Sequence, residues 1–504
     1  MKLIHHSDDR SEQDLDDEPS KLEMDLRAQE ISMESVREEK KKLHEIKERL
    51  DAIEDRIDEI KDEGPSLGRS LRTIFSWRNY SVYLATSWVF TAFSYMGLFY
   101  NLYLLELGWG FVLIGTVLSF TSAISATSRL IGGYVGDVSN RKHLSVVAMF
   151  MMAVYNLIMG IFVEFTWIII ALLFFSTMDV FKGGSTAFIM DNIPKEHSGL
   201  GISLFTAGRV FGIVTLGVFI ILTPLFGFEQ SLRLMFLTGG LFLVGTSIVR
   251  ALFLEGKSPE IRREGVSLVR SFMQENKRAA NLLFKAVPGM IAIVVLDSLS
   301  DSLFRFGAYI YIYEVVGIEI PGLILMSIIT IVVSVPLLLG TGMLSDRRGE
   351  RSTALIIYSI MPICAILLLI APMFPYWAPQ SVINQAESLF VGLGSLFSTP
   401  FLAIVIKSVN DAVWNLLLLT IIQKNLPRKD TSKILSVFWF IVYMFSSVGP
   451  SIGGVVFEFL YQGHLFIVVL VLNFIILGWI ATKGLVKKSE ESEIENENGI
   501  ETNE

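Results

Sequence analysis

The sequence lacks most of the features by which enzymes and secreted proteins are recognised. It has a single cysteine, Cys364, so no internal disulfide can form. None of its six histidines lies within a long apolar run, and neither a Gly-x-x-x-x-Gly-Lys-Ser/Thr loop nor a His-Glu-x-x-His helix occurs. We therefore expect neither an enzyme nor an ATP-driven pump, and we expect no cofactor, no metal site and no nucleic-acid partner.

Charge is also scarce. Only 18% of the residues are charged, whereas 52% are hydrophobic and the mean hydropathy is +0.54. Apolar runs of about 18 or more residues with few charges are typical of membrane-spanning helices. We predict an all-α membrane protein with twelve transmembrane helices, each long enough to cross a hydrocarbon core of ~30 Å. The predicted spans are 80–105, 111–136, 144–165, 167–192, 202–226, 232–253, 286–312, 321–344, 353–374, 399–423, 434–457 and 464–482.

The distribution of charge predicts the orientation. Residues 1–65 carry 22 acidic and 12 basic side chains, and residues 483–504 carry 7 and 3, so the acidity of the chain belongs to its two ends. Connections after even-numbered spans are rich in Lys and Arg, whereas the opposite connections hold only Arg233. Because cytoplasmic loops retain Lys and Arg, we expect a multi-pass protein of the cell membrane with both termini in the cytoplasm. The first apolar run begins near residue 80, so no cleavable signal peptide is expected.

The chain repeats itself. Gly133 and Asp137 recur 209 residues later as Gly342 and Asp346, whereas landmarks further along recur 233 residues apart. The difference of 24 residues indicates an external insertion, for which 375–398 fits in length and place. Its apolar stretch from Ser388 is either a half-inserted segment or an extension of the tenth span. The repeat predicts two six-span halves, 80–253 and 286–482, joined by a basic cytoplasmic linker, 254–285.

The repeated stretches resemble a signature of the major facilitator superfamily. The second copy, "GMLSDRRGER", follows the Gly-x-Leu-Ala-Asp-Arg-x-Gly-Arg-Arg pattern, and the first, "GYVGDVSNRK", is a looser copy with Asn140 where Gly is usual. The resemblance implies a twelve-helix fold and alternating access, with these motifs latching the cytoplasmic side while the cavity opens outward. The gating residues that it implies are Gly133, Asp137, Arg141, Lys142, Gly342, Asp346, Arg347, Gly349 and Arg351.

Ionisable side chains within the spans form the candidate site. Each costs about 2.5–3.5 kcal/mol on insertion scales, so such side chains usually face a cavity or a partner. Several are three or four residues apart and therefore share a helical face. In the family fold, the spans that carry them line the central cavity. The predicted substrate-binding or proton-coupling residues are Arg129, Asp179, Lys182, Arg209, Asp297, Asp301, Arg305, Lys407 and Asp411.

The signs of these charges suggest different roles for the two halves. The first-half set sums to +2 and the second-half set to −1, which favours an anionic or zwitterionic substrate with protons handled by the second half. Asp297 and Asp301 lie one turn apart, and their repulsion favours a proton on one of them. Arg305 is expected to pair with Asp301, which leaves Asp297 as the proton carrier and Lys407 as a competing partner. The alternative is that these residues form salt bridges with no role in transport.

Aromatic and polar residues of the spans are not assigned to the site, because aromatic side chains there more often face lipid or pack between helices. This group includes Tyr95, Asn101, Trp414, Trp439 and Tyr443.

The N-terminal region shows a different pattern. From Val36 to Ile60, apolar residues recur at heptad spacing, which predicts an amphipathic, coiled-coil-like cytoplasmic helix over 21–64. Residues 36–60 would pair with a second copy or with a partner helix, and a solvated single helix is the alternative. Residues 1–20 and 483–504 are expected to be acidic, disordered tails.

The leading functional prediction is a secondary transporter of a small anionic or zwitterionic solute, with proton coupling as an option. One alternative is a drug or metabolite exporter of the same superfamily. The fourth span lacks the Arg-x-x-Gln-Gly stretch of proton-coupled drug exporters, which argues against drug export. The other alternative is a membrane sensor or scaffold that signals through its N-terminal helix, which would bind a ligand without moving it.

Overall fold

The computed structural model describes Lys41, Lys47 and residues 67–182, 204–205, 207–256, 268–348, 350–425 and 431–483; within these ranges the side chains of 137–138 and 335–348, among others, lie outside the description. The chain forms two units, Met1–Thr73 and Ile74–Glu504. In the first unit Lys41 and Lys47 are helical, and α2 (Leu67–Ser76) begins. The rest of the predicted heptad segment and both predicted tails, apart from Lys483, lie outside the described residues.

The second unit is helical throughout its described elements, apart from one isolated bridge between Tyr376 and Ser398. The elements are α3 (Arg78–Ser94), η1 (Tyr95–Phe99), α4 (Tyr100–Glu106), α5 (Phe111–Val138), α6 (Arg141–Ile161), α7 (Phe165–Thr177), α8 (Asp179–Lys182), η3 (Gly208–Val210), α11 (Phe211–Phe226), α12 (Phe228–Phe253), α13 (Leu268–Ala286), α14 (Pro288–Glu314), α15 (Ile320–Arg348), α16 (Glu350–Tyr358), α17 (Met361–Ile370), α18 (Gln380–Leu389), η4 (Leu393–Phe397), α19 (Thr399–Asn425), α20 (Thr431–Ser446), α21 (Gly449–Phe459) and α22 (His464–Lys483).

Many of these helices suit a membrane. Among the described residues, ten segments are long and apolar enough to cross one, or eleven if α13 and α14, which meet at 101°, count as a single broken span. A further apolar helix, Ile320–Ser334, is shorter, so the number twelve stays a prediction. The segments confirm a multi-pass membrane protein. They are Arg78–Glu106, Phe111–Gly136, Arg141–Ile161, Phe165–Lys182, Gly208–Phe226, Phe228–Phe253, Arg351–Ile370, Thr399–Leu418, Ile434–Phe459 and His464–Thr482.

Several of these segments are broken at residues that disfavour a continuous helix. Pro450 stands at the start of α21 and Pro362 at the start of α17, where the missing N–H costs no hydrogen bond. The first span changes from α3 to the 3-10 helix η1, which contains Gly97, before it continues as α4. The break at η1 bears on the site, because Gly97 lines both cavities described below.

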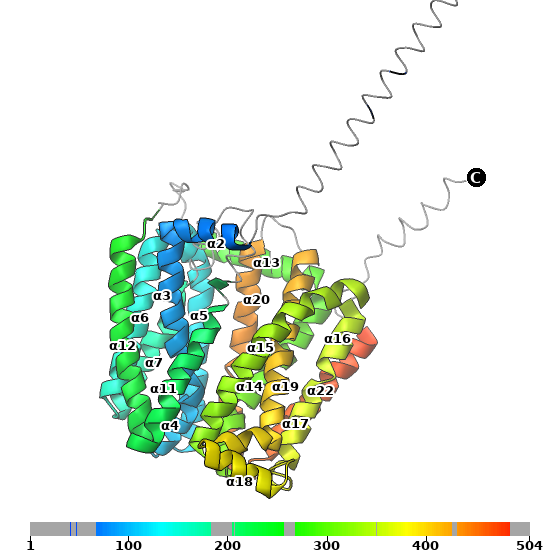
Figure 1. The fold of residues 1–504 in the computed structure, drawn as a ribbon. Helices are drawn as coiled ribbons and strands as arrows, with labels where there is room; N and C mark the ends of the chain where they lie inside the picture. The colour runs from blue at the N-terminus through cyan, green and yellow to red at the C-terminus, as the bar shows by residue number, and fades with distance from the viewer. Residues whose placement is uncertain are drawn as a thin grey trace, which may run out of the picture. The chain divides into compact units, whose positions relative to one another are not determined.

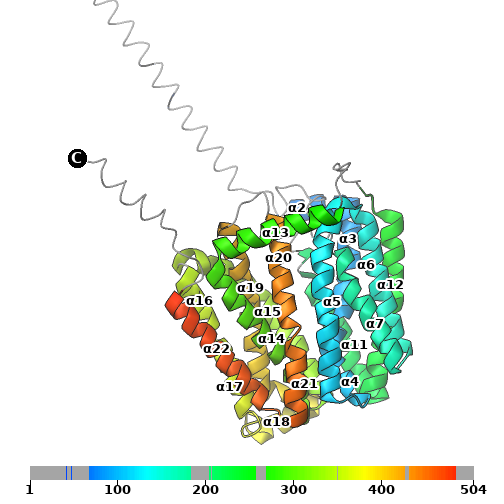
Figure 2. The same ribbon diagram turned by 180° about the vertical axis from the view of Figure 1, so that it is seen from behind.

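The helices gather into two groups. Figures 1 and 2 show the N-terminal helices (α3 to α12) beside the C-terminal helices (α14 to α22), with α13 at one end and α18 at the opposite end. The long helix α5 packs against both α20 and α21. A Cβ added at Gly115 would lie 2.2 Å from the carbonyl oxygen of Pro450, so only glycine allows this approach.

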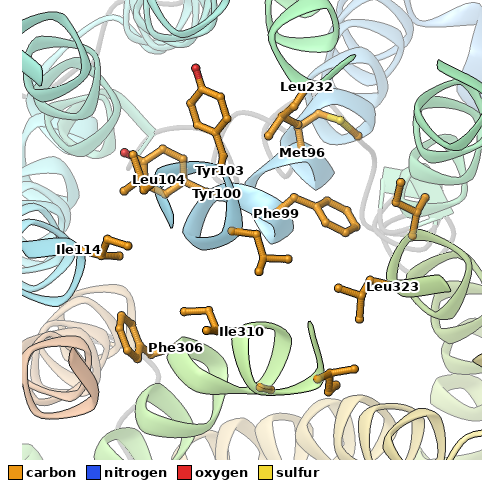
Figure 3. Close-up of a cluster of buried hydrophobic side chains, with 14 of the residues drawn as sticks. Met96, Phe99, Tyr100, Tyr103, Leu104, Ile114, Leu232, Phe306, Ile310 and Leu323 are labelled. Atoms are coloured by element: carbon orange, nitrogen blue, oxygen red, sulfur yellow. The ribbon is translucent and has the colours of Figure 1, made fainter. Parts of the chain in front are cut away.

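A shared apolar core joins the two groups. Figure 3 shows Met96, Phe99 and Leu232 of the N-terminal helices clustered with Phe306 and Leu323 of the C-terminal helices. Across the boundary, the rings of Phe99 and Tyr309 pack edge to face, with their centroids 5.8 Å apart. Burial of these side chains holds the two groups together in the conformation of this structure.

The predicted insertion 375–398 forms α18 and η4. The carboxylate of Glu387 accepts hydrogen bonds from the backbone N–H groups of Gly392 and Gly394, at 2.5 and 2.9 Å. Gly392 has a φ of +86°, a conformation that other residues rarely adopt. Because α19 begins only at Thr399, the stretch from Ser388 is not an extension of the tenth span.

Candidate functional site

Four charged side chains of α14 and α19 form a closed ring. Asp301 accepts hydrogen bonds from Arg305 Nε and from Lys407 Nζ, both at 2.7 Å. Asp411 accepts one from Lys407 and lies 3.6 Å from Arg305 Nη2. Two acids and two bases therefore alternate, and the ring is neutral as a whole. This charged ring contains the pair Asp301–Arg305 that the i,i+4 spacing predicts.

Arg305, Lys407 and Asp411 of the ring line a cavity of about 380 Å³, which we call the charged cavity. Other walls come from Tyr95 and Asn101 of the first span and from hydroxyl-bearing residues of α15. Asn101 also crosses between the two helix groups, since its Nδ2 donates to the Phe306 carbonyl at 3.2 Å. Tyr95 and Asn101 are cavity residues that the sequence analysis leaves out.

Arg209, on η3, also lines the charged cavity and is exposed to it. It forms no ion pair with any residue that the structure describes. Because the ring beside it is neutral, Arg209 leaves the cavity with an uncompensated positive charge. This arrangement favours a ligand that carries a negative charge.

Asp297 lies apart from the charged ring. Its carboxylate accepts hydrogen bonds from the Tyr358 hydroxyl at 2.9 Å and from Trp414 Nε1 at 2.8 Å. The Tyr358 hydroxyl also lies 3.2 Å from Asn473 Oδ1, on α22. In this conformation Lys407 Nζ binds both carboxylates of the ring. The predicted competition of Lys407 for Asp297 requires a change in the shape of the cavity, so it stays a prediction.

The N-terminal helices carry a second charged cluster. Asp179 lies 2.8 Å from Arg129 Nε and 3.5 Å from Lys182 Nζ, so one acid serves two bases. The Arg129 guanidinium also lies 3.7 Å from the centre of the Tyr443 ring on α20, a cation–π contact between the helix groups. A Cβ at Gly132 would lie 2.7 Å from the Asp179 carbonyl oxygen, so this glycine allows α8 to approach α5.

The structure places part of the predicted gating motif. A Cβ at Gly133 would lie 2.6 Å from Ser436 Oγ, so α5 and α20 meet closely there. Asn140, which replaces the usual glycine, caps α6 by accepting from the Lys142 backbone N–H at 3.0 Å. Arg141 Nε donates to the Gly136 carbonyl at 3.4 Å, and Arg351 donates to the Ala481 carbonyl of α22.

The remaining motif positions lie outside the described side chains, so the latch itself stays a prediction. They are Asp137, Gly342, Asp346, Arg347 and Gly349.

Arg250 is a buried charge that the sequence analysis overlooks. It belongs to α12, in the predicted sixth span, and its side chain bonds to Thr86, Ser87 and Ser145 at 2.7–2.9 Å and stacks over Tyr83. It is not among the nine ionisable span residues predicted for the site. A lone Arg near the end of an apolar run resembles a positive anchor in the sequence, and only the packing shows that it joins α3, α6 and α12.

The family is decided by sequence comparison. Residues 82–413 match the family described as Major Facilitator Superfamily, which is more than half of the chain. The chain belongs to the major facilitator superfamily. No curated protein matches the sequence.

Solved structures of major facilitator superfamily transporters share the fold at low identity. A POT family transporter in complex with 5-aminolevulinic acid aligns with a TM-score of 0.61 and 13% identity, over 80% of this chain and 95% of that one. The inward-open xylose transporter XylE from E. coli aligns with 0.56 and 14%, over 83% and 98%. The nucleoside transporter NupG aligns with 0.55 and 11%, over 80% and 96%. At these identities the likeness shows the fold alone.

Proposed function

We propose that this superfamily member carries a small anionic or zwitterionic solute across the cell membrane by alternating access, with the charged cavity as its binding site. The observation that supports this most is Arg209, an exposed guanidinium without an ion-pair partner among the described residues, which lies in a cavity beside the neutral charged ring. A carboxylate or phosphate would satisfy it with two parallel hydrogen bonds.

Charges on the opposite wall extend the recognition. Arg305 is 66% exposed despite its bond to Asp301, so it can share the anion with Arg209. The ammonium group of a zwitterion would meet Asp411 instead. The solved neighbours include a nucleoside transporter, a D-xylose–proton symporter and a POT family transporter in complex with 5-aminolevulinic acid. The fold by itself therefore does not identify the substrate.

Proton coupling, in this proposal, resides at Asp297. Its described partners, Tyr358 and Trp414, are neutral donors, whereas Asp301 and Asp411 each contact two cations. A half-buried carboxylate without a cation is costly, and binding a proton removes that cost. Asp301, a member of the charged ring, lies one turn further along α14 on the same helical face as Asp297. A proton on Asp297 therefore changes the charge next to the ring.

The cytoplasmic face, in this proposal, is the end that carries α13, with both chain termini on that side. Helix α13 carries more basic than acidic side chains, as cytoplasmic segments usually do. Helix α18 lies at the opposite end of the helices (Figure 1). In a variant whose buried Cys364 is replaced by Ala, a cysteine at exposed Asn281 should react with a membrane-impermeant thiol reagent only after lysis of the cells. A cysteine at exposed Ser381 of α18 should react in intact cells, and the reverse pattern would overturn the orientation.

Uptake into proteoliposomes tests the transport function. Small mono- and dicarboxylates, amino acids and matched neutral amides would be supplied with and without a pH gradient. We expect saturable uptake of charged solutes and its loss in Arg209→Gln. Arg233→Gln is the matched control, because Arg233 pairs with Glu229 at the end of α12, outside the charged cavity. Saturable binding without any uptake would instead support the sensor alternative.

A further inference from the structure

A second cavity lies among the N-terminal helices. Its volume is about 420 Å³, and it is lined by α3, η1, α4, α5, α6, α7, α8 and α12. It shares Gly97 and Asn101 with the charged cavity, but none of the charged ring. We call it the aromatic cavity, after the six aromatic side chains in its wall. They are Phe90, Phe93, Tyr100, Tyr155, Phe175 and Phe236.

The aromatic wall is ordered by contacts between its own rings. Tyr155 packs against Phe175 at a centroid distance of 5.0 Å and against the edge of Phe236 at 5.9 Å. Lys182 Nζ lies 4.7 Å from the centre of the Phe90 ring. The cavity therefore combines faces and edges of aromatic rings with one cation, a lining that suits a planar ring bearing a negative charge.

Lys182 is free enough to bind a ligand. Its ammonium group lies 3.5 Å from Asp179, beyond an ordinary hydrogen bond, whereas Arg129 holds the same carboxylate at 2.8 Å. The Lys182 side chain is 35% exposed, and the cluster carries one more positive charge than negative. An anion in the cavity would accept the hydrogen bonds that the Lys182 ammonium group does not donate to Asp179.

A buried hydroxyl group in the wall also lacks a partner. Tyr100 is only 5% exposed, yet its hydroxyl oxygen makes no hydrogen bond with the described residues. Figure 3 shows Tyr100 on α4 beside Tyr103 and Leu104. On α5, the hydroxyls of Ser122 and Ser125 line the same cavity and share a helical face. The Tyr100 hydroxyl oxygen is itself buried within the wall, so the polar groups that the cavity offers to a ligand here are the two serine hydroxyls.

We propose that the aromatic cavity is a binding site for an aromatic carboxylate. Its ring lies between the aromatic side chains, and its carboxylate binds Lys182. This site goes beyond the proposed function, because it contains neither Arg209 nor the charged ring. It stands even if the charged cavity carries a different solute.

Equilibrium binding to the purified full-length protein tests this site. The probes are 4-hydroxybenzoate, benzoate, cyclohexanecarboxylate and the neutral 4-hydroxybenzamide, measured by calorimetry and by the rise in unfolding temperature. We expect 4-hydroxybenzoate and benzoate to bind, and we expect loss of the carboxylate charge or of the aromatic ring to weaken binding about tenfold each.

Two variants test the contact with Lys182. Lys182→Gln should weaken 4-hydroxybenzoate binding about tenfold, and Lys182→Arg should retain most of it, which excludes a mere folding defect.

Arg209→Gln locates the ligand. If the acid occupies the aromatic cavity, this variant retains a saturable component of binding, and that component is weakened by Lys182→Gln. Binding that is lost in Arg209→Gln but retained in Lys182→Gln would place the acid in the charged cavity and overturn the inference. Equal binding of cyclohexanecarboxylate, or no saturable binding of any aromatic acid, would overturn it as well.

Discussion

The two charged clusters bury charge in different ways. In the N-terminal helices a single acid, Asp179, serves both Arg129 and Lys182. In the C-terminal helices each base of the charged ring contacts two acids, Asp301 and Asp411. The first cluster keeps a net positive charge and has no spare partner. The second is neutral, and each of its members has two partners of opposite charge. One ion pair can therefore break during a conformational change while every charge keeps a partner.

Removing the shared acid of each cluster would break this comparison most severely. Asp179→Asn leaves Arg129 and Lys182 without a described carboxylate, and it should destabilise the protein by about 1–3 kcal/mol, since both bases are more than a third exposed. Asp301→Asn should cost clearly less, because Asp411 still contacts both Arg305 and Lys407. Unfolding temperatures of the two variants in the same detergent measure the difference. Equal losses would show that the ring is not redundant.

Asp297→Asn sharpens the comparison within the second group. The amide still accepts a hydrogen bond from Tyr358 or Trp414 but cannot bind and release a proton, so we expect gradient-driven accumulation to be abolished while substrate exchange continues. Asp301→Asn should instead weaken folding or substrate binding in both assays. Proteoliposome accumulation and counterflow measure the two activities, and accumulation that survives in Asp297→Asn would refute the coupling role.

The two copies of the signature motif extend the comparison to gating. The second copy follows the family pattern more closely, so Asp346→Asn should slow transport severalfold and shift the protein away from outward-open states, with a smaller effect for Asp137→Asn. Uptake rates and the accessibility of an external reporter cysteine would be measured with insertion as a control. Wild-type rates in both variants would rule out the gating role.

The smallest expected effect concerns the contact between the two groups. Tyr443→Leu removes the aromatic face under Arg129 while it keeps the apolar bulk, which should cost about 0.5–2 kcal/mol. If Asp179 alone positions Arg129, the cost would fall to zero. A double-mutant cycle with Arg129→Gln, read from unfolding temperatures, distinguishes the two cases.

Local spacing in the sequence predicts part of the candidate site. Asp301–Arg305 and Lys407–Asp411 lie four residues apart on single helices, and both pairs form in the structure. Residues that the sequence analysis sets aside complete the picture, since Tyr95 and Asn101 line the charged cavity and Trp414 binds Asp297. Spacing along one helix cannot show these contacts, because they depend on which helix lies opposite.

The sequence by itself determined that this is a multi-pass membrane protein of the major facilitator superfamily, because apolar runs and a repeated motif are properties of short segments. Only the tertiary structure decided which charges meet. Tyr358 and Asp297 are 61 residues apart, and Trp414 and Asp297 are 117 apart, yet each pair forms a hydrogen bond. Arg250 likewise finds its partners 105 to 164 residues away. In an apolar interior a polar group must bond to whatever donor or acceptor packing brings near it, so the packing of the helices sets these partners.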